Sequence, residues 1–378
     1  MKKALVHDWF SVYAGAERCV ESFTNIWDDF DIFSLVDFLD SKDREIILKG
    51  KISQTSFIQN LPLSKNKFRN YLPLFPFAIE QLDLREYDLV LSSSHAVAKG
   101  VLTRHDQLHI SYIHTPIRYA WDMYLNYLEQ NSLQSGFKSL LARYFLHKIR
   151  LWDIACANRV DLYIANSNFV SNRIRKIYRK DSKVIYPPVD TNKFKINSKK
   201  DDFYITVSRL VAYKKVDLIV RAFNENGKKL VVIGDGNEMT RIKSIARSNI
   251  EILGFQDSKI SADMMSRAKA FVFAAIEDFG ITPVEAQACG TPVICLNRGG
   301  ARESVIDGVS GVYFADQNVQ SIVEAVDKFE KNLDKFDSNI IKAHANKFSK
   351  DRFESEIKEF VEDSYDKFRF GGIDALRK

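Results

Sequence analysis

The sequence predicts an α/β protein that is built from two doubly wound parallel sheets. Short apolar runs alternate with helical patterns along the chain, which is typical of parallel strands joined by crossover helices. At 378 residues the chain is too long for one ordinary hydrophobic core. The alternation stops at Pro187 and Pro188 and restarts after a polar stretch. We therefore expect a first domain over residues 1–188, a second over 189–350, and a terminal helix over 351–378 that packs back on the first domain.

The first half contains short apolar and β-branched runs that predict its strands. The expected strands cover residues 4–9, 31–36, 87–93, 109–113, 160–165 and 183–186. The first strand is followed by a loop with Gly15 and a helix from about Glu17, which is how a mononucleotide-binding unit begins. Gly15 would permit close approach of another group, although a simple tight turn would also explain it. Residues 53–82 are rich in proline and aromatic residues, and they predict loops and a short helix.

His114 is expected at the carboxyl end of its strand, because Pro116 stops the strand there. In an open α/β sheet, the carboxyl ends of the strands border the ligand crevice. Arg118, Trp121 and Asp122 follow on the same segment. The pattern favours a functional histidine, while a structural one remains the alternative.

The second half repeats the alternation. Its expected strands cover residues 203–207, 229–233, 250–253, 270–275, 292–296 and 311–314. Strand ends are followed by Arg209 and Lys214, by a glycine turn at 234–236, and by Phe255. From about residue 321 the chain predicts charged helices. The last of these carries an apolar stripe formed by Phe353, Ile357, Phe360 and Val361.

Residues 277–285 form the stretch around which the second half is interpreted. They follow a buried strand and lead into a helix expected over 283–289, with Thr282 as N-cap and Pro283 in the first turn. Such a helix start directs free N–H groups at a phosphate. Glu277 and Glu285 flank the stretch. A capping box between Thr282 and Glu285 would explain the second carboxylate without a ligand.

Composition excludes several classes of protein. Hydrophobic content of 46% and charged content of 28% are those of a soluble globular protein. The four cysteines are far apart and form no CxxC pair, so we expect free thiols in a reducing compartment. The N-terminus does not resemble a signal peptide, and no apolar run approaches the length of a membrane span. We therefore expect a cytoplasmic protein.

Positive charge is concentrated in residues 131–180, which carry ten Lys/Arg against two Asp. Within this segment Leu140, Leu141, Tyr144, Phe145, Lys148 and Leu151 suggest an amphipathic helix with a basic side. Such a helix could lie on an anionic membrane surface at the inner face of the cell membrane, or it could be a core helix with a solvated basic face. No zinc-finger, RRM or helix-turn-helix pattern is present, so we expect no nucleic-acid partner.

The strand-end residues of the second half indicate a nucleoside-diphosphate site. Two cations, Arg209 and Lys214, together with a helix N-terminus suit a pyrophosphate, and a carboxylate suits a ribose diol. The two cations could also be plain surface charges. Met239 stands where a dinucleotide fingerprint needs its third glycine, and no Walker A sequence occurs, so an oxidoreductase and an NTPase are disfavoured. No Asp-x-Asp follows a strand, so we expect no metal and no cofactor besides the donor substrate.

The combined motifs resemble the retaining glycosyltransferases of family 4, over nearly the whole chain. The resemblance rests on Gly15-Ala16-Glu17, His114, Ser208-Arg209-Leu210 with Lys214, Pro187-Pro188-Val189-Asp190, Gly234-Asp235-Gly236, Gly254-Phe255, the Glu277 and Glu285 pair, residues 288–294 and Gly299-Gly300. Departures are small, such as Ser208 and Lys215 in place of glycines usual in the family. The resemblance implies the GT-B fold, with two Rossmann-like domains facing a central cleft.

The resemblance also implies roles for single residues. The expected catalytic residues are His114, Glu277, Arg209 and Lys214, of which the last two stabilise the leaving diphosphate. The expected donor-binding residues are Gly15, Ser208, Arg209, Lys214, Gly234, Phe255, Glu277, Phe279, Gly280, Ile281, Thr282 and Glu285. The expected acceptor-binding residues are Gly15, Ala16, Arg118, Trp121 and Asp122. No covalent nucleophile is assigned.

Residues 112–122 look like those of bacterial O-antigen and exopolysaccharide mannosyltransferases that use GDP-mannose. We therefore expect transfer of a hexose, namely mannose, to a lipid-linked oligosaccharide at the inner face of the membrane. A UDP-sugar donor is the runner-up. A non-catalytic subunit that binds nucleotide sugars in a polysaccharide assembly complex is the alternative from another class.

Overall fold

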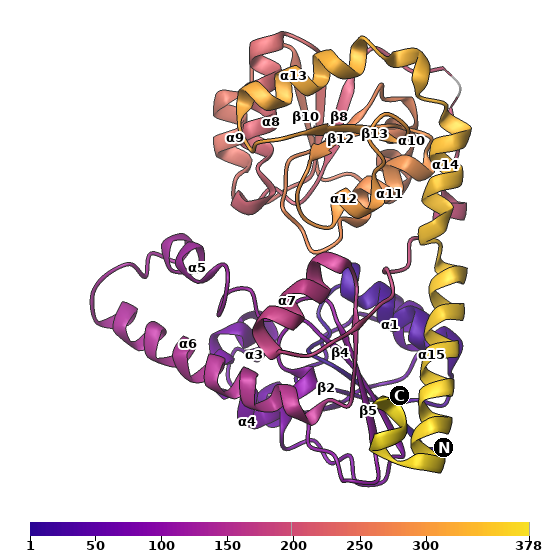
Figure 1. The fold of residues 1–378 in the computed structure, drawn as a ribbon. Helices are drawn as coiled ribbons and strands as arrows, with labels where there is room; N and C mark the ends of the chain where they lie inside the picture. The colour runs from indigo at the N-terminus through magenta and orange to yellow at the C-terminus, as the bar shows by residue number, and fades with distance from the viewer. Residues whose placement is uncertain (198, 378) are drawn as a thin grey trace. The chain divides into compact units, whose positions relative to one another are not determined.

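The computed structural model describes residues 1–197 and 199–377, and the chain divides into two compact units (Figure 1). Unit 1 comprises Met1–Tyr186 and Phe353–Lys378, and unit 2 comprises Pro187–Arg352. Each unit contains its own parallel sheet with helices on both faces, so the predicted α/β class with two doubly wound sheets is confirmed.

Unit 1 is organised around a parallel sheet with the strand order β3-β2-β1-β4-β5-β6-β7. Its strands are β1 (Lys3–His7), β2 (Asp31–Ser34), β3 (Gln54–Thr55), β4 (Leu89–Ser94), β5 (Leu108–Ile113), β6 (Leu162–Ala165) and β7 (Lys183–Val184). Its α-helices are α1 (Gly15–Ile26), α2 (Ser41–Leu48), α3 (Ser64–Lys67), α4 (Phe75–Ile79), α5 (Tyr124–Gln130), α6 (Phe137–Cys156), α7 (Asn168–Tyr178) and most of α15 (Lys350–Gly371). The chain reverses its direction of sheet growth between β1 and β4, which is where an open α/β sheet forms its crevice.

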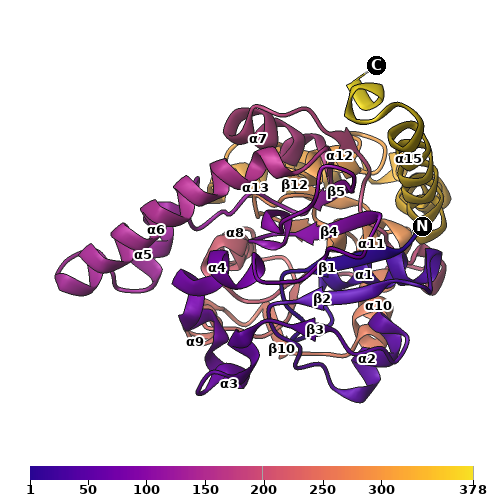
Figure 2. The ribbon, with the colours of Figure 1, turned by 90° about the horizontal axis from the view of Figure 1, so that it is seen from below.

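The two faces of this sheet follow from the alternation of side chains along the strands. Leu5 packs in one cluster, with residues of α1, α2 and α15, while its neighbours Ala4 and Val6 pack in another, with residues of α4. Figure 2 shows α1, α2 and α15 on one side of the sheet and α3, α4 and α6 on the other. Residues 53–82, predicted as loops and a short helix, contain α3, α4 and short 3₁₀ turns, and they also contain the short strand β3, which was not predicted.

The apolar stripe of α15 packs on unit 1. Phe353, Ile357 and Val361 are buried in the same cluster as Phe23 and Tyr112. The rings of Phe353 and Tyr112 meet edge to face with centroids 5.7 Å apart. Burial of three large apolar side chains holds the end of the chain against the face that α1 and α2 cover.

A buried histidine makes the stability of unit 1 depend on pH. His109 lies in β5, fully buried, and its ring nitrogens meet Ser92 Oγ at 2.8 Å and Arg159 O at 3.2 Å. Burial lowers the pKa of His109 from 6.5 to about 4, against the raising effect of the Arg159 carbonyl. Between these pH values the unfolded chain holds a proton on this ring that the folded chain does not.

We expect the free energy of unfolding of unit 1 to fall by about 3 kcal/mol as the pH drops from 6.5 to 4, through His109 alone. Burial also lowers the pKa of His95 and of His114, so both add to the loss in the same direction. Denaturant titration followed by tryptophan fluorescence would measure it, because all four tryptophans lie in unit 1. A free energy of unfolding that stays constant over this range, or an imidazole of His109 that titrates near 6.5, would contradict the expectation.

Unit 2 has a parallel sheet with the strand order β10-β9-β8-β11-β12-β13. Its strands are β8 (Tyr204–Val207), β9 (Leu230–Ile233), β10 (Ile250–Gly254), β11 (Phe271–Phe273), β12 (Val293–Leu296) and β13 (Gly311–Phe314). Its α-helices are α8 (Val216–Asn226), α9 (Met239–Ile245), α10 (Ser258–Arg267), α11 (Ile281–Ala288), α12 (Ala301–Ser304), α13 (Val319–Glu330) and α14 (Ser338–Ala345). Here the order reverses between β8 and β11.

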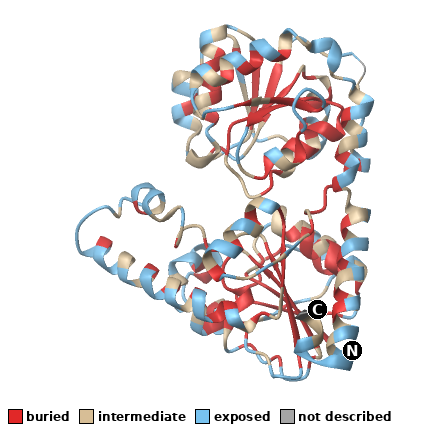
Figure 3. Cartoon of the chain, viewed as in Figure 1, coloured by how far each residue is buried: buried red, intermediate tan, exposed pale blue. Residues whose placement is uncertain are grey.

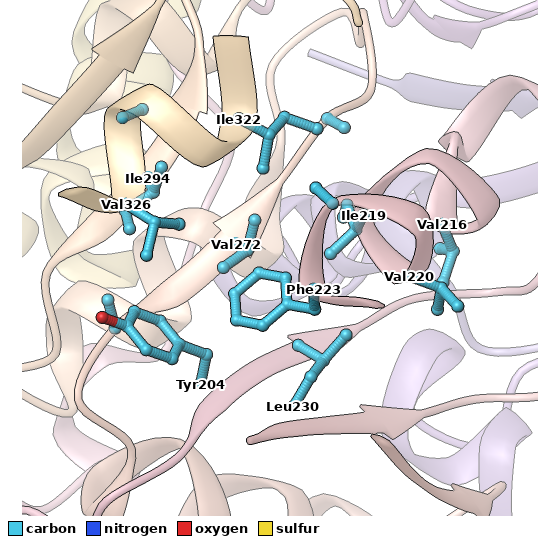
Figure 4. Packing of buried hydrophobic residues seen from close by; sticks show 14 of the residues in the cluster. Tyr204, Val216, Ile219, Val220, Phe223, Leu230, Val272, Ile294, Ile322 and Val326 are labelled. Carbon is cyan, nitrogen blue, oxygen red and sulfur yellow. The ribbon is translucent and has the colours of Figure 1, made fainter. Parts of the chain in front are cut away.

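The inner strands of both sheets are buried, as Figure 3 shows, while the edge strands β3, β7 and β10 are partly exposed. In unit 2, one face of the sheet packs on α8 and α13. Figure 4 shows Phe223 of α8 among Tyr204, Leu230 and Val272 of three strands, with Ile322 and Val326 of α13 nearby. The inner strands of this sheet are covered on both faces, so their sequences are apolar nearly throughout, whereas the edge strand β10 carries the exposed Glu251.

Candidate functional site

The candidate site of unit 2 lies on the loops that follow β8 and β11. These two strands are adjacent, and their connections leave to opposite sides, so their carboxyl-terminal loops border the crevice of the sheet. Lys214 lies on a 3₁₀ turn (Ala212–Lys214) after β8, and Glu277 lies on the loop after β11. Their side chains form an ion pair between Lys214 Nζ and Glu277 Oε1, and both are mostly buried. The structure thus brings together two residues that lie 63 positions apart in the chain.

Other predicted residues lie on the loops that follow β8 and β10. Ser208 directly follows β8, is half-buried and donates its N–H to the Ile233 carbonyl at 3.0 Å, whereas the next residue, Arg209, is exposed. Lys215 adopts the left-handed conformation with φ of 57°, which explains why a glycine would be usual at this position. Phe255 follows β10 and is exposed.

Gly234 has a structural reason to be glycine. A Cβ at this position would lie 1.8 Å from the carbonyl oxygen of Ser208, and the residue has φ of 141°. Gly236 is equally confined, because its Cβ would lie 2.2 Å from the carbonyl oxygen of Leu210. The loop after β9 therefore presses on the loop after β8 and fixes its path. A contact of Gly234 with a donor stays a prediction.

The start of α11 differs from the prediction. The expected N-cap, Thr282, is the second residue of the helix, and Gly280 is the N-cap, with φ of 91°. Pro283 is the third residue, which is tolerated because the first-turn N–H groups have no partner within the helix. No side chain caps this helix, so the capping-box explanation of Glu285 is wrong. Glu285 instead lies more than one turn inside α11, half-buried.

The α11 start still offers backbone N–H groups at the carboxyl edge of the sheet, from Ile281 and Thr282. Phe279 contributes only its backbone to this edge, because its ring is buried against Phe348 with centroids 5.5 Å apart. Cations, N–H groups and two carboxylates are the groups that bind a diphosphate and a diol.

Two glycines after β12, outside the predicted site residues, hold the loop that carries Glu277. A Cβ on Gly299 would lie 2.8 Å from the Glu277 carbonyl oxygen, and one on Gly300 would lie 2.3 Å from that of Asp278. The Gly300 N–H donates to the Glu277 carbonyl at 2.8 Å. A pair of glycines in the loop two residues after a predicted strand is the signal that could have identified them.

In unit 1, the candidate residues gather at the carboxyl ends of β1, β4 and β5. His114 follows β5, and its Nε2 lies 2.8 Å from Ser93 Oγ at the end of β4. Ser93 Oγ lies 3.1 Å from His7 Nδ1 at the end of β1. Burial, together with the charges of His95 and His7, holds the pKa of His114 well below its usual range. The ring of His114 is therefore neutral at pH 7.

Asp8 organises the next loop. Its carboxylate is fully buried and accepts four backbone N–H bonds of 2.6–2.9 Å, from residues 95–98. Its Oδ2 also lies 3.0 Å from His95 Nδ1. Burial alone would raise the pKa of Asp8, but His95, His7 and the backbone bonds hold it below its ordinary value. Asp8 and Ser93 were not predicted; the polar run at 92–95 that ends a strand is the signal for Ser93, and the carboxylate directly after β1 is the signal for Asp8.

Gly15 and Ala16 are the first two residues of α1, two positions before the expected start at Glu17. Their N–H groups are therefore among those that a helix leaves without an internal partner. Glu17 accepts the Ala14 N–H at 3.1 Å and lies 3.6 Å from His7 Nε2. The α1 start is thereby tied to the end of β1.

The residues predicted to bind the acceptor have structural partners. Trp121 donates its indole N–H to Asp153 at 2.7 Å, and Asp122 accepts from Arg173 at 2.7 Å. Asp153 is fully buried and is also paired with Lys99. Arg118 lies one turn before Asp122 on the same segment and is half-buried. Acceptor binding by Arg118, Trp121 and Asp122 stays a prediction.

Metal ligation has no candidate in the residues described. Within 1–197 and 199–377, no group of three or more His, Cys, Asp or Glu side chains could hold a metal ion. In the same part of the chain, no helix has the length and apolar character to cross a membrane.

Two family models match the chain. Residues 188–347 match the model described as Glycosyl transferases group 1, and residues 35–193 match the model described as Glycosyltransferase Family 4. Together they cover most of the chain, one in each half. The chain belongs to these glycosyltransferases. The predicted resemblance to family 4 and the predicted GT-B fold are thereby confirmed.

Individual relatives of this glycosyltransferase match it in part. An alpha-1,3/1,6-mannosyltransferase of Saccharomyces cerevisiae is 26% identical over 208 residues, covering 40% of this chain and 41% of that protein. A GDP-mannose-dependent alpha-(1-6)-phosphatidylinositol monomannoside mannosyltransferase of Mycolicibacterium smegmatis is 29% identical over 143 residues, covering 32% of this chain and 37% of that protein. The chain thus spans less than half the length of these curated relatives. The structure of Anabaena HepE in complex with UDP has the same fold, with a TM-score of 0.70, 18% identity, and coverage of 96% of this chain and 100% of that chain.

Proposed function

We propose that this glycosyltransferase transfers a hexose, namely mannose from GDP-mannose, to a lipid-linked oligosaccharide, with retention of the anomeric configuration and without a metal ion. The observation that carries the proposal is the Lys214–Glu277 ion pair on the loops after β8 and β11 of unit 2, with Arg209 on the same loop as Lys214. In this proposal the two cations would hold the diphosphate, because phosphates bind at the carboxyl ends of the strands in nucleotide-binding sheets.

The cations have a defined task in such a transfer. As the bond between the sugar and the diphosphate breaks, negative charge builds up on the leaving oxygen, and Lys214 and Arg209 would stabilise it. Glu277 holds the Lys214 ammonium in place before the donor arrives, and it would accept a hydrogen bond from a sugar hydroxyl. Glu285 would accept hydrogen bonds from the ribose hydroxyls. In this proposal the acceptor hydroxyl attacks the face that the diphosphate leaves and gives its proton to the leaving phosphate.

His114 would act by hydrogen bonding and not by charge. Its lowered pKa keeps the ring neutral at pH 7, so it would add no charge next to a sugar. Ser93 engages Nε2, so a ligand would meet Nδ1. A neutral ring at a strand end suits contact with sugar hydroxyls, which both donate and accept hydrogen bonds.

The choice of mannose as the donor sugar and of guanine as the donor base is supported by other observations than the ion pair. Residues 112–122 resemble those of bacterial mannosyltransferases, and two relatives are named as mannosyltransferases, one of them as GDP-mannose-dependent. A UDP-sugar is the second candidate, because the similar fold of HepE was solved in complex with UDP. The exposed Phe255 beside the carboxyl end of β10 is where a base would be read in either case.

Calorimetric titration with GDP and with UDP, in a chelator, tests the proposal. We expect GDP to bind more tightly than UDP and the binding to need no metal. Tighter binding of UDP would mean that the donor is a UDP-sugar and not GDP-mannose, while the proposed roles of the residues would stay the same. Binding of neither nucleotide would contradict the site in unit 2. Tight binding of GDP without turnover of GDP-mannose on any lipid-linked acceptor would favour a non-catalytic subunit.

A further inference from the structure

α6 is apolar on two opposite faces, and only one of them is covered within the described structure. The buried face packs on unit 1 through Leu146, Ile149 and the fully buried Asp153. The opposite face is exposed and carries six large apolar side chains, which are Phe137, Leu140, Leu141, Tyr144, Leu151 and Ile154. Their spacing places them on one side of the helix. Figure 3 shows the exposed positions along α6, and Figure 1 shows that α6 extends away from the sheet of unit 1.

An exposed face of this kind is unlike that of the other long helix of unit 1. On α15 the exposed positions are mainly charged, as at Glu359, Asp363 and Lys367. On α6 the exposed positions other than Lys138, His147 and Lys148 are apolar. A helix that is apolar all round is normally covered on all sides. The exposed face of α6, defined by the six apolar residues and these three basic ones, therefore calls for an occupant.

The charge of this face selects the occupant. Its ionisable residues, Lys138, His147 and Lys148, are all basic, and the single acidic residue of α6, Asp153, is buried on the other side and paired with Lys99. A second copy of this chain would place the same basic residues against each other. The face belongs to a projecting helix and is not a groove, so it does not suit a bound peptide helix. A surface that offers negative charge, with an apolar layer directly beneath, matches the basic residues, the exposed apolar side chains and the projecting position of this helix.

α6 is also anchored firmly enough to present this face. Trp152 donates its indole N–H to Glu80 at 2.8 Å, and Arg150 donates to the Ala120 carbonyl at 2.9 Å. The buried ion pair between Asp153 and Lys99 holds the carboxyl-terminal half of the helix on unit 1. The exposed side chains are therefore free to insert while the helix keeps its place.

We propose that the exposed face of α6 docks on a bilayer of anionic lipids, with its apolar side chains inserted among the headgroups. The inference rests on α6 alone and goes beyond the proposed reaction. It explains how a chain that reacts with a lipid-linked acceptor would reach it. It also predicts that binding depends on both the apolar and the basic residues.

Co-sedimentation of the whole chain with vesicles tests the proposal. Vesicles of phosphatidylcholine alone are compared with vesicles in which a third of the lipid is phosphatidylglycerol. We expect binding to the second kind, weakened by salt. Leu140→Glu should lower the partition coefficient about tenfold or more, because an apolar anchor is lost and a like charge is added. Lys148→Glu should lower it about tenfold at low salt and much less at high salt.

Two controls match these variants elsewhere on unit 1. Ile52→Glu changes an equally exposed apolar residue, and Lys358→Glu changes an exposed lysine of α15. Both should bind vesicles as the unchanged chain does. Absence of binding to anionic vesicles, or equal losses in variants and controls, would overturn the proposal. So would a dimer, seen by light scattering, that Leu140→Glu dissociates while vesicle binding is unchanged. Titration of Leu140→Glu with GDP separates this outcome from a failure of the donor site.

Discussion

Lys214→Ala is expected to lower the rate of sugar transfer by about a hundredfold to a thousandfold while the chain stays folded. The Lys214 ammonium is mostly buried against Glu277 at the crevice of unit 2, where it would meet the diphosphate. Removing it takes away the charge that stabilises the leaving group and also leaves Glu277 without this partner. The rate of release of the nucleoside diphosphate from the donor, in the presence of a lipid-linked acceptor, measures the effect.

The neighbouring lysine gives a matched control. Lys215 is exposed and adopts a left-handed conformation that alanine tolerates about as well as lysine. Lys215→Ala should therefore change the transfer rate by less than about threefold, since it alters only a surface charge. Glu277→Ala should lower the transfer rate to a similar extent, and the double variant with Lys214→Ala should be little worse than either single one because the two residues act as a pair. A near-normal rate in Lys214→Ala would refute the role assigned to it.

The sequence was sufficient to predict a doubly wound parallel sheet in each half and the position of the strand-end residues, but not the order of the strands. Parallel strands that are covered on both faces appear in the sequence as short apolar runs. The polar residue that follows each run lies at the carboxyl edge of the sheet, where the crevice forms. His114, Arg209 and Glu277 were found in this way, and all three follow a strand in the structure. Their roles stay predictions.

Predictions from local sequence patterns failed where contacts between residues far apart in the chain determine a helix start or a side-chain partner. Thr282 and Pro283 fit the usual start of a helix, but α11 begins at Ile281 because Gly280 before it adopts a left-handed conformation. The loop that contains Gly280 is held from outside, since the Gly300 N–H donates to the Glu277 carbonyl. Similarly, nothing near Trp121 in the sequence shows that its indole meets Asp153, which is 32 residues away. Such contacts form only after the sheet has assembled, so periodicity and capping patterns do not contain them.

Asp8 is the strongest example, and its replacement should have the largest effect on stability. Asp8→Ala would leave four buried N–H groups of residues 95–98 without their acceptor. Each unsatisfied buried group costs roughly 1–3 kcal/mol, so we expect the free energy of unfolding of unit 1 to fall by about 4 kcal/mol or more. Asp8→Asn keeps one acceptor oxygen, and it should lose less.

Denaturant titration followed by tryptophan fluorescence measures this loss, because the tryptophans report on unit 1. Asp83→Ala is the matched control, since Asp83 is an exposed carboxylate of the same unit that is paired with Arg85. It should change the free energy of unfolding little, because solvent screens an exposed ion pair. The loop that Asp8 holds follows Ser93, whose hydroxyl meets His114, so Asp8→Asn should also shift the titration of the His114 imidazole. Equal losses in Asp8→Ala and Asp83→Ala would mean that the four bonds contribute little, and that another contact fixes the loop beside His114.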